Sequence, residues 1–348
     1  MRNPGKRTLY RRYGLSVLMI GTAASALGCD SGVSGPDDAL AGRFSAWSPA
    51  VRVESLPGTH SEFNTSSLDG CPLRSRDGKK FFMASDRPGG LGGIDIWVST
   101  RASENDPWGA PANLGAPINS SVDDFCPTID RDGIRFFFVS ARATWSGGPA
   151  CGGADIYVTR FRSDGSAEDP QNLGCDSNGG PNSAASEASP SPLPAEGGGG
   201  AVLYFSSARA GGFAPTEAAG AVVGDQDIYV SRFVGGKYGR GELAPDVNSA
   251  SDDAQPNVRR DGLEIFFFST RPGGLGAADI YSATRARTSD SWSVPGNAGA
   301  NVNTAASETR PSVSWDGTSL VFGSTRPGGE GSTDIYIATR VPVAGGSN

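Results

Sequence analysis

The sequence predicts an all-β fold, a β-propeller with five four-stranded blades, and three observations lead to that prediction. Many short apolar runs lie between Gly, Pro, Asn and Asp turns, without long amphipathic helical stretches. One residue pattern returns five times along the chain, and the two ends of the chain complement each other. Repetition of this kind indicates a modular array, which a propeller builds from blades arranged around an axis.

The repeated pattern is an Asn, a Ser or Thr, three further residues, an acid, two residues and a Pro. Its five copies are Asn64/Asp69/Pro72, Asn119/Asp124/Pro127, Asn182/Glu187/Pro190, Asn248/Asp253/Pro256 and Asn303/Glu308/Pro311. An apolar run, a Ser-x-Arg, a Gly-containing loop and Asp-Ile-aromatic follow each copy. A residue that every unit carries is explained more simply by construction of the unit than by a binding site.

The fourth unit illustrates one blade. Residues 256–259 read as a short strand, an Asp-Gly turn follows, and the apolar run 263–269 is typical of a strand buried on both faces. Residues 280–284 form the third predicted strand, and a fourth begins at Trp292. Four antiparallel strands in each repeated unit describe a propeller blade.

The chain ends predict ring closure. The last unit stops after residues 335–340 without the Trp-containing strand, and that missing piece precedes the first unit as Trp47-Ser48-Pro49. Residues 44–56 are therefore expected to supply the outer strand of the last blade, which protects the sheet edge. The propeller is predicted over residues 44–340, with a tail at 341–348. Six blades are the alternative, because units two and three carry insertions.

The N-terminus reads as an export signal. Residues 1–28 combine a basic start with a short apolar stretch and end in Ala26-Leu27-Gly28-Cys29, which resembles a bacterial lipobox. Cys29 is the expected lipid attachment site, and residues 29–43 a flexible tether; ordinary secretion is the alternative. Loss of residues 1–28, with five basic residues and no acid, takes the net charge from −7 to −12. That charge disfavours nucleic acid as a partner.

The repeats resemble the WD40-like repeats of TolB-type β-propellers, a family of the bacterial envelope. The residues that carry the resemblance are Ser85–Gly90 with Asp95–Trp97, Ser269–Gly274 with Asp279–Tyr281, and Ser324–Gly329 with Asp334–Tyr336. The resemblance spans roughly residues 44–340. It implies a propeller fold, and protein–protein interaction or scaffolding more often than catalysis.

The charged residues of the repeat have structural and functional interpretations. The arginines Arg87, Arg142, Arg209, Arg271 and Arg326 are expected to form structural ion pairs with the acids of Asp-Ile-aromatic, and the alternative is a set of anion-binding cations. The acids of the repeat pattern should ring one channel mouth. They either cap loop N–H groups or form a carboxylate ring. The doubled acids Asp123-Asp124 and Asp252-Asp253 break the repeat and are the predicted binding residues.

Other chemistries find little support. The glycine-rich loops precede strands rather than helices and lack Gly-Lys-Ser/Thr, so a nucleotide site is rejected. His60 is the sole histidine, so a catalytic triad would depend on that one residue, and without a Cys-x-x-Cys a zinc site is disfavoured. No cofactor is expected. Two axial carboxylates roughly 5–10 Å apart would still suit a glycosidase.

The insertions point to one face of the ring. Unit two inserts residues 143–153 with Trp145, and unit three inserts residues 210–224, both between the second and third strands. Loops on a rigid scaffold commonly carry binding sites. Cys151 and Cys175 are predicted to form a disulfide that pins the first insertion. Cys71 and Cys126 occupy equivalent positions and either pair or remain small core residues.

These observations together favour an exported, monomeric, non-enzymatic binding or scaffolding propeller. The preferred partner is an envelope protein that meets the insertion-bearing face, and the membrane is reached only through the lipid anchor. A glycan-binding lectin and a glycan-active hydrolase are the alternatives. Exposed aromatics such as Trp145 would favour the lectin, and two close axial carboxylates would favour the hydrolase.

Overall fold

The computed structural model describes residues 43–130, 133–162, 164–194, 200–213 and 226–343. The compact unit to which they belong runs over residues 35–348. The predicted signal peptide, Cys29 and the tether up to residue 42 lie outside the described residues. Within the described part of the chain, no helix is long and apolar enough to cross a membrane.

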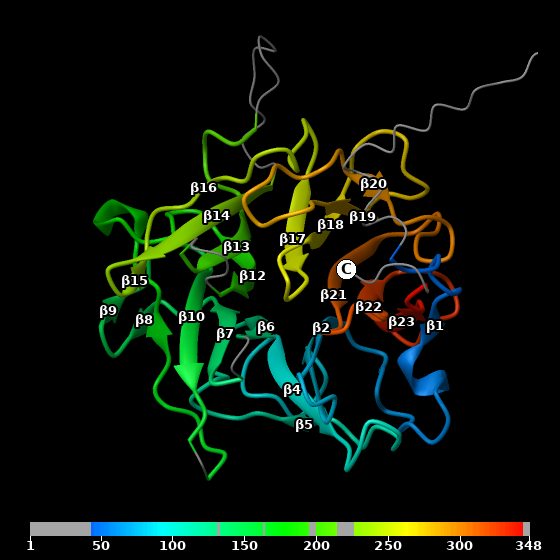
Figure 1. The fold of residues 1–348 in the computed structure, drawn as a ribbon. Helices are drawn as coiled ribbons and strands as arrows, with labels where there is room; N and C mark the ends of the chain where they lie inside the picture. The colour runs from blue at the N-terminus through cyan, green and yellow to red at the C-terminus, as the bar shows by residue number, and fades with distance from the viewer. Residues whose placement is uncertain (1–42, 131–132, 163, 195–199, 214–225, 344–348) are drawn as a thin grey trace, which may run out of the picture. The chain divides into compact units, whose positions relative to one another are not determined.

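Five antiparallel sheets are arranged as a ring, which confirms the predicted five-bladed propeller (Figure 1). Blade 1 contains β2 (Asp69–Arg74), β3 (Lys80–Ser85), β4 (Asp95–Thr100) and β5 (Ala112–Asn113). Blade 2 contains β6 (Asp124–Ile129), β7 (Arg135–Ser140), β10 (Asp155–Arg160) and β11 (Gln171–Asn172). The inserted hairpin β8 (Thr144–Trp145) and β9 (Gly148–Pro149) lies between β7 and β10 in the sequence.

The other three blades follow the same plan. Blade 3 contains β12 (Glu187–Leu193), β13 (Val202–Ser207), β14 (Asp227–Val234), β15 (Lys237–Tyr238) and β16 (Glu242–Leu243), so it has five strands rather than four. Blade 4 contains β17 (Asp253–Val258), β18 (Glu264–Ser269), β19 (Asp279–Thr284) and β20 (Gly296–Asn297). Blade 5 contains β21 (Glu308–Val313), β22 (Ser319–Ser324), β23 (Asp334–Thr339) and β1 (Val51–Arg52).

The ring closes as the chain ends predict. β1 is the outer strand of blade 5, where Val51 and Arg52 pair with Ile337 and Tyr336 of β23. A short 3-10 turn, η1 (Val53–Ser55), follows β1. Phe44 forms a bridge with Pro342, so the start of the predicted tail also joins this blade. Closure by both ends of the chain removes the free edge that an open sheet would expose.

The fourth strand of blade 4 is one place where the prediction was wrong. Trp292 does not begin that strand; β20 starts at Gly296. The Trp292 side chain is buried in the core between blades 3 and 4, and the Arg285 guanidinium lies 4.0 Å from the centre of its ring. Packing against the neighbouring blade therefore decides the position of this aromatic residue, rather than pairing within its own sheet.

Each sheet buries both faces because it stands between two neighbours. Five apolar clusters join successive blades; the one between blades 3 and 4 includes Tyr204, Ile228, Ile265 and Phe267. Equivalent clusters close the other four junctions, including the junction between blades 5 and 1. This arrangement explains why the second strand of each blade is a continuous apolar run instead of an alternating one.

The innermost strand of every blade contains a β-bulge two residues after its acid. The bulged residues have positive φ although none is glycine: Cys71 (45°), Cys126 (49°), Ser189 (48°), Gln255 (57°) and Arg310 (55°). The pairing register shifts at the same place in all five blades. Non-glycine residues rarely adopt this backbone conformation, and it costs about 1–3 kcal/mol per residue. The five bulges place these residues around the axis of the ring.

Candidate functional site

The arginines and acids of the repeat form five ion pairs within their own blades. The pairs are Arg87 with Asp69, Arg142 with Asp124 (2.9 Å), Arg209 with Glu187 (3.1 Å), Arg271 with Asp253 (2.5 Å) and Arg326 with Glu308 (3.2 Å). All five acids are completely buried. The expected structural ion pair therefore exists, but the partner predicted for each arginine was wrong: it is the acid of the innermost strand, not the acid of Asp-Ile-aromatic.

The remaining oxygens of these acids are also occupied. In blade 2, Asp124 Oδ2 accepts hydrogen bonds from the backbone N–H (2.6 Å) and hydroxyl (2.7 Å) of Ser120. The other four acids accept the same two hydrogen bonds from the Ser or Thr four residues earlier. Because every carboxylate caps its own loop, the repeated acids do not form a carboxylate ring that an axial ligand could reach.

The other repeated polar residues join one blade to the next. Asn119 accepts a hydrogen bond from Ile96 N–H and donates one to Ile96 C=O, both at 2.9 Å. The equivalent asparagines clamp the corresponding isoleucine of the preceding blade in the same way. The acid of Asp-Ile-aromatic accepts from the glycine-rich loop before it, as Asp279 does from Gly276 N–H at 3.1 Å. The pattern thus builds the ring.

The doubled acids take part in the same construction. Asp123 Oδ1 accepts a hydrogen bond from Ile94 N–H of blade 1 at 2.9 Å, and Asp252 Oδ1 accepts one from Gln226 N–H of blade 3 at 2.8 Å. Both acids are partly exposed, whereas Asp124 and Asp253 beside them are buried. The structure therefore gives all four residues contacts within the ring, and their predicted role in ligand binding stays a prediction.

The insertion in blade 2 is held by a disulfide. Cys151 and Cys175 are bonded, with their Cα atoms 5.3 Å apart, as the sequence analysis favours for this pair. Trp145, on β8, is half-buried against the core between blades 1 and 2, and its ring lies over Gly147, where a Cβ would come within 2.1 Å of it. Of the insertion in blade 3, residues 214–225 lie outside the described residues.

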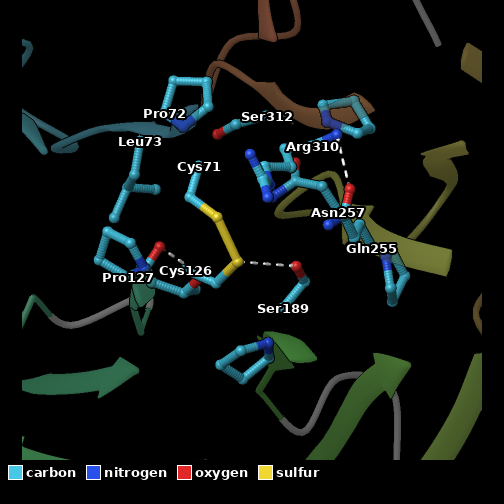
Figure 2. A pocket seen from close by; sticks show the side chains of 14 residues that line it. Cys71, Pro72, Leu73, Cys126, Pro127, Ser189, Gln255, Asn257, Arg310 and Ser312 are labelled. Atoms are coloured by element: carbon cyan, nitrogen blue, oxygen red, sulfur yellow. Dashed lines mark hydrogen bonds between the residues drawn. A yellow bond between two sulfur atoms is a disulfide. The ribbon is translucent and has the colours of Figure 1, made fainter. Parts of the chain in front are cut away.

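The axial pocket lies between the five innermost strands, in the middle of the ring (Figure 2). Its volume is about 30 Å³. A disulfide between Cys71 and Cys126, which sequence analysis left open, forms the side that belongs to blades 1 and 2. The bulged residues Ser189, Gln255 and Arg310 form the other side. The rest of the wall consists of the five prolines of the repeat together with Leu73, Thr128, Asn257 and Ser312, and none of the lining residues is acidic.

A second pocket of about 50 Å³ forms one mouth of this channel. The two pockets share Leu73, Thr128, Asn257 and Ser312, so they are continuous. Arg74 at the end of β2 and Arg260 and Trp315 in the turns after β17 and β21 line the mouth, again without an acid. This mouth lies opposite the insertions, because the turns between first and second strands emerge on the other face of the ring.

Two of the three arginines in these pockets have no ion pair within the described residues and have a lowered pKa. Burial lowers the pKa of the Arg310 guanidinium, and no neighbouring carboxylate raises it again. Burial, and then the positive charge of Arg101, lowers the pKa of Arg74, although Asp316 and Glu104 act in the opposite direction. The lining of the axial channel is consequently cationic and contains no acid, although Asp316 and Glu104 lie near Arg74 at the mouth.

Sequence analysis missed these axial residues. The signal that could have found them lies between the acid and the Pro of each repeat, where Cys, Cys, Ser, Gln and Arg replace one another while the flanking residues recur. His60, by contrast, is exposed and accepts a hydrogen bond from Glu62 N–H. Among the described ranges, no group of three or more His, Cys, Asp or Glu residues is placed to hold a metal ion.

Comparison with known proteins supports the fold. No protein-family model and no curated protein matches the chain. A structure of BT0996 in a complex with RGII has a TM-score of 0.55 at 12% identity, over 85% of this chain and 92% of that protein. A GH43_12 protein retrieved from a capybara gut metagenome has a TM-score of 0.50 at 14% identity, over 84% of this chain and 55% of that protein.

TolB structures also appear among the similar ones. A putative TolB from Agrobacterium tumefaciens has a TM-score of 0.43 at 14% identity, over 87% of this chain and its whole length. The chain spans about half (55%) of the length of the GH43_12 structure and of TolB from Acinetobacter baumannii. The structures with a TM-score of 0.50 or more share the fold at 12–14% identity, which does not establish an activity, and the resemblance to TolB-type repeats stays a prediction.

Proposed function

We propose that this chain is a non-enzymatic binding propeller that recognises a protein partner at the bacterial envelope. The observation that carries the proposal is that the five repeated carboxylates are buried and occupied by their own blades. A glycosidase requires two carboxylates that reach the substrate, and the axial pocket contains no acidic residue. The hydrolase alternative therefore lacks the accessible axial carboxylates on which its interpretation of the sequence depends.

Exposed apolar side chains in the loops of three blades on the insertion-bearing face support a protein partner. Leu91, Phe213 and Leu275 occupy equivalent positions in the loops between second and third strands and are 52%, 44% and 50% exposed. Their backbone N–H groups donate to the acid that begins the next strand, so the loops present these side chains in a defined orientation. Apolar side chains displayed on rigid loops are common in protein interfaces.

Partner capture from envelope extract tests the proposal. We would compare the wild type with a variant that carries Leu91→Ser, Phe213→Ser and Leu275→Ser. Val294→Ser is the matched control, because Val294 is 91% exposed in a loop on the opposite face. We expect one protein to be captured by the wild type and the control and to be lost from the triple variant, provided that the variant unfolds at the same temperature.

Polysaccharide turnover distinguishes the enzyme from the binding module. A hydrolase would release reducing ends, and Asp124→Asn or Asp253→Asn would abolish the release. The binding propeller produces none, and the same substitutions lower its stability instead, since they remove the buried charge that neutralises Arg142 or Arg271. Saturable glycan binding without turnover would replace the protein partner with the lectin alternative.

The proposed location follows from the N-terminal segment. Export and attachment of a lipid to Cys29 would place the propeller at a membrane surface, with residues 30–43 as the tether. Metabolic labelling with a fatty acid, compared between the wild type and Cys29→Ala, tests this. Equal labelling of the two proteins would contradict lipid attachment at Cys29.

A further inference from the structure

Arg310 is a cation inside the axial pocket for which the described part of the chain supplies no anion. Its Nε atom is buried and has no hydrogen-bond partner, and its guanidinium takes part in no ion pair. An arginine remains protonated in proteins even when burial lowers its pKa. The side chain as a whole is partly exposed to the pocket, and a charge in a pocket wall without a counter-charge makes an anion from solution the expected partner.

The amides beside Arg310 are oriented as donors. Gln255 Oε1 accepts a hydrogen bond from Arg310 N–H, and Asn257 Oδ1 accepts one from Val313 N–H, both at 2.9 Å. Since each oxygen is occupied by a backbone donor, the NH₂ groups of Gln255 and Asn257 are left for the pocket that both residues line. Figure 2 shows the two amides on the blade-4 side of Arg310 and its guanidinium reaching toward Cys71 on the blade-1 side. A pocket that offers donors and contains no acid suits an anion.

The site is built by two departures from the repeat. Arg310 replaces the Cys, Ser or Gln of the other blades, and Gly70 replaces the Phe, Ala or Thr found directly after the acid elsewhere. A Cβ at Gly70 would come 2.6 Å from Arg310 Nη1. The glycine of blade 1 therefore leaves the space that the arginine of the neighbouring blade 5 occupies.

From this geometry we propose that the axial channel is a binding site for a small carboxylate anion. The planar guanidinium matches the two oxygens of a carboxylate, and the amide NH₂ groups offer further donors. The inner pocket of about 30 Å³ accepts the carboxylate group, and the mouth of about 50 Å³ accepts a short organic remainder. Arg74 and Arg260 attract the anion at the mouth. The site needs no protein partner and does not depend on the proposed function.

Saturation-transfer NMR with acetate as the probe tests the site on the purified protein at constant ionic strength. We expect saturable transfer to acetate in the wild type and in Arg287→Met, the matched control, which removes an exposed arginine from the loop between β19 and β20. Arg310→Met should weaken binding by at least about tenfold, since a charge-assisted hydrogen bond is lost. Gly70→Ala should weaken it as well, because the new Cβ displaces the guanidinium without removing its charge.

Measurements of thermal stability and of competition between anions distinguish the proposed site from a structural role of Arg310 and from non-selective anion binding. Without a ligand, Arg310→Met should unfold at the same temperature as the wild type or higher, because it removes an unpaired charge whose Nε is buried without a partner. A clear decrease would assign Arg310 a structural role and overturn the proposal. Equal transfer in the wild type and Arg310→Met would also overturn it. So would stronger displacement of acetate by chloride or phosphate than by succinate, since the site would then not be selective for carboxylates.

Discussion

Arg271→Ala is the perturbation that tests the internal ion pairs most directly. Arg271 donates to Asp253 Oδ1 (2.5 Å), Ser269 Oγ (2.8 Å) and the Val247 carbonyl (2.8 Å). Its guanidinium also lies 5.3 and 5.0 Å from the ring centres of Phe267 and Tyr281. Asp253 is completely buried, so the substitution leaves an uncompensated carboxylate in the protein interior.

The expected loss of unfolding free energy comes from the Asp253 carboxylate, which Arg271→Ala leaves without a positive partner. Removal of one partner of a buried ion pair costs about 3–5 kcal/mol. For a propeller of about 300 ordered residues, the entropy of unfolding is about 0.6 kcal/mol/K, so the melting temperature should fall by roughly 5–8 °C. The double variant Arg271→Met with Asp253→Asn should recover part of this loss, because neither charge remains.

Urea unfolding followed by tryptophan fluorescence, alongside thermal melting, measures the effect. Arg287→Ala is the control, since Arg287 is exposed and should change stability by less than about 0.5 kcal/mol. A loss below about 1 kcal/mol for Arg271→Ala would refute the reasoning, because it would mean that water or another group neutralises Asp253. A double variant that is no more stable than Arg271→Ala would show that the stranded charge is not the cause.

Two further predictions concern pH and the inserted loop. Burial raises the pKa of Asp155, so the folded state holds this proton more tightly than the unfolded chain; the stability due to it is complete below the unfolded pKa and is lost as pH rises through the folded pKa. Asp155→Asn should therefore gain stability relative to the wild type over that pH range in parallel melting curves, and a constant difference would contradict the prediction. Cys151→Ser with Cys175→Ser should destabilise the protein by about 3 kcal/mol for a crosslink between residues 24 apart, with faster hydrogen exchange in residues 143–153. Detection of all four cysteines as free thiols in the unfolded, unreduced protein would contradict both disulfides.

The repeat pattern was sufficient for the number of blades and the closing strand. Each copy contains the Asn that clamps the preceding blade and the acid that caps its own loop, so the blade count follows from their recurrence. The pairing of the arginines could not be obtained in the same way. Two acids per unit lie within reach along the sequence, and the bulged strand decides that Arg142 meets Asp124 rather than Asp155.

The candidate site was predicted less well, because the sequence pattern displays repeated and doubled charges and not the residues that face the axis. Asp123 and Asp252 drew attention as departures from the pattern, yet each accepts a backbone N–H from the preceding blade. The sequence does show that Arg310 lies two residues after Glu308, where the other repeats have Cys, Ser or Gln. Nothing in one dimension indicated that its bulge faces the axis, or that Gly70, 240 residues earlier, leaves room for its guanidinium.

The sequence by itself determined a five-bladed propeller, because periodic apolar runs and turn residues act locally and repeat whatever the surroundings. It also determined which polar residues would build every blade alike. Only the tertiary structure decided which charges are neutralised and which have no ion pair among the described residues. That outcome depends on groups from different blades meeting at the axis, where the Arg310 Nε is buried without a partner and the neighbouring blade determines the space around the guanidinium.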